Sequence, residues 1–143
     1  MSQVPINFFT EDISFLLKQK ALTRRWIYET IKNEGYSLKE LNFIFCSDDY
    51  LLNINRQYLN HDTFTDIITF DNSEIQKSIT GDIYISIHRI KENSIEYNVN
   101  ERDELHRVII HGTLHLLGYG DKKKSDKLLM TKKEDFYLAK RIF

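Results

Sequence analysis

Residues 100–121 read NERDELHRVIIHGTLHLLGYGD, the most informative stretch of this chain. Asn100 is a favourable helix N-cap, and Asp103 takes the place of the usual glutamate of a capping box three residues later. Gly118 can end a helix and reverse the chain, because glycine adopts the left-handed backbone conformation without a steric penalty. The stretch therefore predicts a helix that is followed by a sharp turn.

Two histidines of this helix form a candidate metal site. His111 and His115 are four residues apart, so they lie on one helix face and can converge on one ion. The turn at Gly118 can return Asp121 to that face as a third ligand. Three protein ligands with an open fourth position are typical of catalytic zinc. The alternative is a pair of ordinary core or surface histidines, but apolar neighbours make an unpartnered imidazole costly and favour the metal site.

Length and composition indicate one globular domain. We expect residues 1–143 to form a single domain, since one proline and five glycines leave no room for a flexible linker. Cys46 is the only cysteine, so a zinc site must use histidine and carboxylate ligands. The chain shows no basic leader and no stretch near the ~20 apolar residues of a membrane span, and we expect a cytoplasmic protein without membrane contact.

Hydrophobic periodicity predicts about four strands and four or five helices, an α+β (mixed α/β) fold. The expected strands cover residues 4–9, 41–45, 66–70 and 82–87. The expected helices cover residues 11–34, 48–58, 89–97 and 125–142, in addition to the helix that follows Asn100. The metal site is then expected at the C-terminal end of a helix.

The candidate site favours hydrolysis of an anionic substrate. A bound zinc ion lowers the pKa of its water to about 7 and polarises a phosphoryl or carbonyl oxygen. Proteases of the H-E-x-x-H type place a glutamate beside the first histidine, but Gly112 stands there. Residues 122–143 carry a charge of +5 against −6 in the rest of the chain. This basic segment suits a phosphodiester, although a solvated helix face is the alternative interpretation.

Three sequence blocks resemble a known family. His111-Gly-x-Leu-His115-Leu-x-Gly118-Tyr119 resembles the signature of the YbeY family, zinc-dependent single-strand endoribonucleases of ribosomal RNA maturation. Residues 65–70 (TDIITF) and 81–85 (GDIYI) are similar to two further blocks of the family, in the same order. The resemblance implies a zinc-activated water that attacks a phosphodiester of single-stranded ribosomal RNA, with the ribosome as partner.

The third metal ligand departs from the family motif. The motif continues with Tyr-Asp-His, and its final histidine is the third zinc ligand. Gly120 and Asp121 stand at the last two positions here, so the resemblance implies a site of His111, His115 and Asp121. A carboxylate in place of an imidazole favours binding of harder divalent ions, such as manganese, as alternatives to zinc.

The family's catalytic arginine is also replaced. The resemblance places this arginine in the loop before the Thr-Asp block, where the chain has Leu59. Arg56 lies nearby and is the candidate for the catalytic role. The alternative is that Arg56 is an ordinary solvated helix residue.

Asp82 is a second catalytic candidate. It begins a predicted strand and can hydrogen-bond a ligand histidine or act as general base toward the metal-bound water. The plain alternative is a turn aspartate beside Gly81. The remaining histidines, His61, His88 and His106, are expected at the surface and not as ligands.

Three functions are compatible with these residues. The first is a metal-dependent endoribonuclease acting on single-stranded ribosomal RNA, which we predict. The second is another metallohydrolase, acting on a peptide or a small molecule. The third is a non-catalytic, ribosome-associated module with a structural metal.

Overall fold

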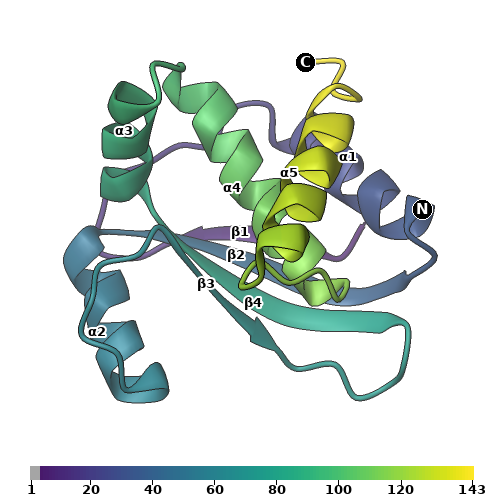
Figure 1. Cartoon of the computed structure of the whole chain (residues 1–143), viewed down its shortest axis with the longest axis horizontal. Helices are drawn as coiled ribbons and strands as arrows, with labels where there is room; N and C mark the ends of the chain where they lie inside the picture. The colour runs from purple at the N-terminus through teal and green to yellow at the C-terminus, as the bar shows by residue number, and fades with distance from the viewer. Residues whose placement is uncertain (1–3) are drawn as a thin grey trace.

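A four-stranded sheet with the strand order β1-β2-β4-β3 forms the centre of the computed structural model, which describes residues 4–143 (Figure 1). The strands are β1 (Ile6–Thr10), β2 (Ser37–Cys46), β3 (Ile67–Asp71) and β4 (Ser78–Ser86). The helices are α1 (Lys20–Asn33), α2 (Asp48–Leu59), α3 (Ile87–Glu96), α4 (Glu101–Leu116) and α5 (Lys124–Leu138). Strands β1, β2 and β4 are parallel, and β3 is antiparallel to β4. This architecture confirms the predicted α+β fold.

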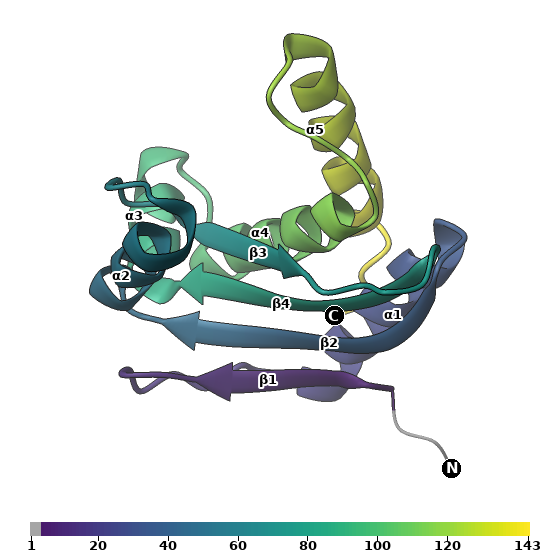
Figure 2. The ribbon, with the colours of Figure 1, turned by 90° about the horizontal axis from the view of Figure 1, so that it is seen from below.

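Helices α1 and α4 cover one face of the sheet, as Figure 2 shows with the sheet in front of them. The side chains of β2 and β4 alternate, so that one set of apolar residues enters the core beneath these helices. Burial of each such side chain stabilises the fold by roughly 1.5–3 kcal/mol. The fully buried members of this core include Leu41, Phe43, Ile83, Ile85, Ile109, Ile110 and Leu114. Within residues 4–143, no helix is both long and apolar enough to span a membrane.

Helix α1 begins at Lys20, nine residues later than predicted. Asp12 and Gln19 both have positive φ angles (36° and 55°), which no continuous helix allows. Tertiary contacts hold this segment in its irregular path. Ser47 donates to the Asp12 carboxylate through its N–H (3.1 Å) and its hydroxyl (2.6 Å), and Phe15 packs on the core. The apolar periodicity of residues 11–19 therefore reflects core contacts outside any helix.

Two glycines allow α4 to lie close to the sheet. A Cβ atom on Gly81 would lie 2.9 Å from both the Phe70 carbonyl oxygen and Leu116 Cδ1. A Cβ atom on Gly112 would lie 2.6 Å from Ile67 Cδ1. Real Cβ atoms are not found at such distances from their neighbours. The glycine beside His111 thus has a packing role, which explains why no larger residue occupies that position.

Gly81→Ala is expected to lower the free energy of unfolding by about 1–3 kcal/mol. The added methyl group meets a backbone oxygen, which cannot move aside as the end of a flexible side chain can. Gly120→Ala is the matched control, because its Cβ would meet only Asp126 Oδ2 at an ordinary 3.6 Å. Urea denaturation of both variants tests the expectation. Equal stabilities would show that the sheet can shift to accommodate the methyl group.

His106 is buried, contrary to the expectation that it lies at the surface. Its relative exposure is 3%, and its ring lies 5.6 Å from that of Trp26 and 5.2 Å from that of Phe143. Arg141 Nη1 lies 2.6 Å from His106 Nδ1. An arginine only donates, so Nδ1 accepts this bond. Burial, together with the positive charges of Arg141 and Arg102, lowers the pKa of His106 to about 4.

The buried, neutral His106 predicts a loss of stability in acid. As the pH falls from 6.5 toward 4, the unfolded chain gains a proton on His106 that the folded chain does not bind. The free energy of unfolding should decrease over this range by up to roughly 3 kcal/mol from this residue. His106→Phe should remove most of that decrease in urea titrations at several pH values. His88→Phe, at an exposed histidine, is the control that should leave it unchanged.

Candidate metal centre

Helix α4 carries His111 and His115 in its last two turns. The helix begins as predicted, because the Asp103 N–H donates to Asn100 Oδ1 (2.8 Å) and satisfies one of the free donors of the first turn. It ends in a Schellman motif, in which Gly118 has a φ of 97°. The N–H of Gly118 donates to the His115 carbonyl (3.0 Å). The chain then reverses direction beside the two histidines.

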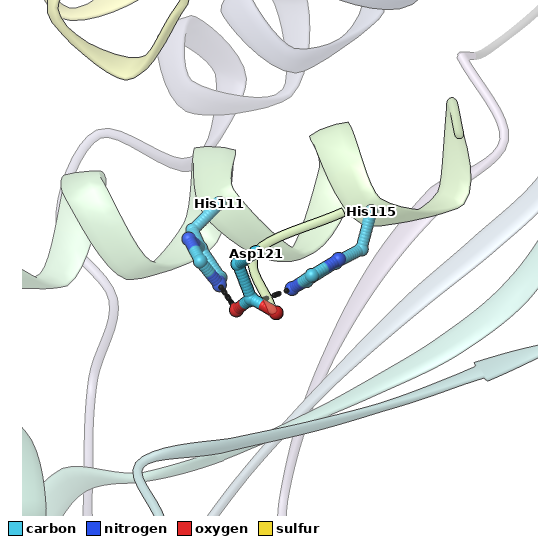
Figure 3. Close-up of side chains that lie close together, drawn as sticks. All are labelled: His111, His115 and Asp121. Atoms are coloured by element: carbon cyan, nitrogen blue, oxygen red, sulfur yellow. Dashed lines mark hydrogen bonds and ion pairs between the residues drawn. The ribbon is translucent and has the colours of Figure 1, made fainter. Parts of the chain in front are cut away.

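This reversal brings Asp121 between the two imidazoles (Figure 3). Asp121 Oδ2 lies 3.3 Å from His111 Nε2 and 3.2 Å from His115 Nε2. The three ligand atoms all lie within 4.8 Å of one another. We call His111, His115 and Asp121 the metal cluster. The structure thus brings together all three of the ligands predicted from the sequence, at the C-terminal end of α4.

The hydrogen bonds of the two imidazoles leave both Nε2 atoms available to a metal. His115 Nδ1 lies 2.8 Å from the Tyr119 carbonyl oxygen, which only accepts, so Nδ1 carries the proton. His111 Nδ1 lies 2.6 Å from Glu134 Oε2, a carboxylate oxygen that accepts, so this Nδ1 also carries the proton. In the neutral rings, both Nε2 lone pairs therefore face Asp121. Two imidazoles and one carboxylate are a donor set for zinc and for harder divalent ions, and the metal cluster suits one such ion.

Negative charge surrounds His111. Burial disfavours its charged form, but the hydrogen bond to Glu134 and the charges of Glu134 and Asp121 outweigh burial and raise the pKa of His111. Burial also raises the pKa of Asp66, although the nearby His111 partly opposes this. Asp66 Oδ2 accepts a hydrogen bond from Asn93 Nδ2 (3.1 Å). The same charges that attract a proton to His111 also favour a metal cation at the cluster.

A cavity of about 440 Å³ opens beside the metal cluster. One side of its wall is formed by the metal cluster itself. The other side is formed by the end of α2, the loop at residues 60–66 and strand β3, and includes Leu59, His61 and Asp66. Among residues 4–143, no lysine or arginine contributes to this wall. Its volume falls within the range of sites for small molecules and cofactors.

The structure places Arg56 outside the cavity wall. Its Nε lies 2.5 Å from Asp62 Oδ1, and about half of its side chain is exposed. Leu59, which the sequence resemblance aligns with a catalytic arginine, does line the cavity. His61 lines it too, so this histidine is part of the candidate site and not merely a surface residue.

Asp82 is not brought to the metal cluster, which corrects the role considered for it. Its carboxylate accepts hydrogen bonds from Asn42 Nδ2 (3.0 Å) and Asn72 Nδ2 (3.4 Å). The neighbouring positions Gly81 and Ile83 meet α4, and successive strand residues point to opposite faces. A carboxylate outside the metal cluster does contact one of its histidines, but it is that of Glu134 of α5, which the sequence did not suggest.

Comparisons with known proteins agree with the fold and identify the family. A family model described as "Endoribonuclease YbeY" matches residues 6–141. Endoribonuclease YbeY of Cytophaga hutchinsonii is 52% identical over 143 residues and covers 100% of both chains. That of Karelsulcia muelleri is 53% identical over 133 residues, which are 93% of each chain. A solution structure from Thermotoga maritima matches with a TM-score of 0.65 and 28% identity, covering 93% of this chain and 86% of that one. This chain therefore belongs to the YbeY family of endoribonucleases, metal-dependent enzymes that act in ribosomal RNA maturation.

Proposed function

We propose that the metal cluster binds one divalent ion, with zinc as the resident metal, and that residues 1–143 act as one hydrolase domain on single-stranded ribosomal RNA in the cytoplasm. The main support for this proposal is that His111 Nε2, His115 Nε2 and Asp121 Oδ2 lie within 4.8 Å of one another. The hydrogen bonds at both Nδ1 atoms support this assignment, because they hold the rings in the form that a metal requires.

The chain contributes orientation and a shaped cavity to the reaction. An ion held by the metal cluster would lower the pKa of a water molecule and polarise a phosphoryl oxygen. Glu134 and the Tyr119 carbonyl hold the two imidazoles, so the ligands need little rearrangement when the ion binds. The cavity gives a phosphodiester access to the metal cluster from the side of α2 and the following loop.

Lysines next to the metal cluster provide charge for an RNA strand. Lys122, Lys123 and Lys124 follow Asp121 directly, Lys127 lies three residues further on, and all four are exposed. If they contact phosphates, the logarithm of the RNA association constant should fall linearly with the logarithm of the salt concentration, with a slope of roughly −0.7 per neutralised phosphate. Replacing Lys122 and Lys124 by glutamine should flatten that slope by about one to two units. The same change at Lys18 and Lys39, outside this segment, is the control, and equal slopes in both variants would exclude these phosphate contacts.

The proposed activity is tested with protein of defined metal content. Metal-free protein should not cleave a single-stranded RNA, and one equivalent of zinc should restore cleavage. A peptide substrate should stay intact under both conditions. Cleavage that is independent of metal, or hydrolysis of the peptide, would contradict the proposal. Stoichiometric zinc binding without any RNA cleavage would instead support a structural metal.

A further inference from the structure

Glu134 of α5 occupies the side of His111 that faces away from Asp121. Its Oε2 lies 2.6 Å from His111 Nδ1, and its side chain is 9% exposed. Its Oε1 accepts a hydrogen bond from Arg107 Nη1 at 2.8 Å. Arg107 lies four residues before His111 on α4, so the two side chains share one helix face. Both carboxylate oxygens of Glu134 therefore have a partner on α4, one histidine and one arginine.

We propose that Glu134 is a positioning residue for the metal ligand His111, and that Arg107 holds it in this role. The inference rests on the proposed metal cluster. The Glu134 carboxylate accepts the proton of Nδ1, which directs the Nε2 lone pair toward Asp121. Glu134 lies on the Nδ1 side of His111, opposite the Nε2 atom that faces Asp121, so its role is to support the ligand and not to bind the ion.

The two histidine ligands differ in the charge of their partners. His115 donates to the Tyr119 carbonyl, a neutral group, whereas His111 donates to a carboxylate. A carboxylate partner makes an imidazole more basic and therefore a better electron donor to a cation, and loss of such a partner typically weakens metal binding by about 10–100-fold. The structure thus assigns His111 as the stronger imidazole ligand, and Glu134 as the residue that makes it so.

The alternative is that Glu134 only docks α5 on α4. Arg107 forms a second ion pair that serves this purpose, with Asp135 Oδ1 at 2.7 Å. Asp135 is 60% exposed and accepts no hydrogen bond from His111. It is therefore a matched control, since it shares the helix and the arginine but not the histidine.

Zinc affinity of the full chain, measured by competition with a chelator, separates the two interpretations. Glu134→Gln keeps the shape of the side chain and can still accept from Nδ1, but it removes the charge. We expect Glu134→Gln to weaken zinc binding by about 10–100-fold while one ion per chain still binds at saturation. Asp135→Asn should retain the affinity of the unmodified protein. Both variants should keep its circular dichroism spectrum.

Two results would overturn the positioning role. One is an unchanged zinc affinity in Glu134→Gln, and the other is an equal loss in Asp135→Asn, which would indicate helix docking alone. If Glu134→Gln does not fold, Glu134→Asp takes its place, because the shorter carboxylate withdraws from Nδ1 and should weaken binding in the same way. Failure of the unmodified protein to bind zinc would contradict the proposed metal cluster itself, which is a distinct outcome.

Discussion

Replacing His115 by alanine is expected to leave a folded protein that has lost its metal ion and its RNA cleavage. The substitution removes one of the three proposed ligands, and the two that remain are an imidazole and a carboxylate. The loss of affinity should exceed the roughly 10–100-fold typical of a residue that only supports a ligand. His115 is partly exposed at the end of α4, so water can fill the space that its ring leaves.

Metal analysis after dialysis, together with an RNA cleavage assay, measures this effect. His88→Ala is the control, because His88 is an exposed histidine that accepts from the Asp48 N–H and takes no part in the metal cluster. The control should retain one ion per chain and full cleavage. Full metal occupancy in His115→Ala would refute the ligand assignment.

Leu59→Arg is expected to raise the rate of RNA cleavage, by up to about 10²-fold. Leu59 is the last residue of α2, is 41% exposed and lines the cavity beside the metal cluster. No lysine or arginine among residues 4–143 contributes to that cavity wall. Removing one preorganised donor to transition-state charge typically costs 10²–10³-fold in rate, so adding one at this wall should recover part of that factor. Single-turnover cleavage of a short RNA measures the change.

Arg56→Gln tests whether the arginine already present near the cavity takes part in catalysis. Arg56 lies on the same helix, but it is paired with Asp62 and lies outside the cavity wall. We therefore expect its loss to change the rate much less than Leu59→Arg does. A large decrease would assign Arg56 the catalytic role that the sequence predicted for it. If neither variant changes the rate, neither position supplies charge to the reaction.

The features that were predicted correctly depend on short stretches of chain. The Asn100 cap joins residues three positions apart, and the two histidines are one helical turn apart. The turn at Gly118 needs only the backbone preference of glycine, and it is sufficient to return Asp121 to the helix. Local hydrogen bonding and helical geometry decide these features, so they can be predicted from the sequence.

Asp82 shows a signal that was present but was given too little weight. The alternate positions around it are Ile79, Gly81, Ile83 and Ile85, and all four are buried. The alternation already assigns Asp82 to the opposite face of β4, away from α4. Its position at the start of a predicted strand, on which the predicted role depended, says less about its neighbours than this alternation does.

The sequence by itself indicated the α+β class and the three residues of the metal cluster, because periodicity, capping and ligand spacing act over a few residues. The family followed separately, from the resemblance of three sequence blocks to a known signature. Only the tertiary structure decided which groups surround that cluster. Glu134, which contacts His111, lies on α5 and is 23 residues further along the chain. His106 is buried against Phe143 and accepts a hydrogen bond from Arg141, and both of these residues lie near the C-terminus. Such contacts depend on how α5 and the chain end pack on α4, and no spacing within the sequence specifies that packing.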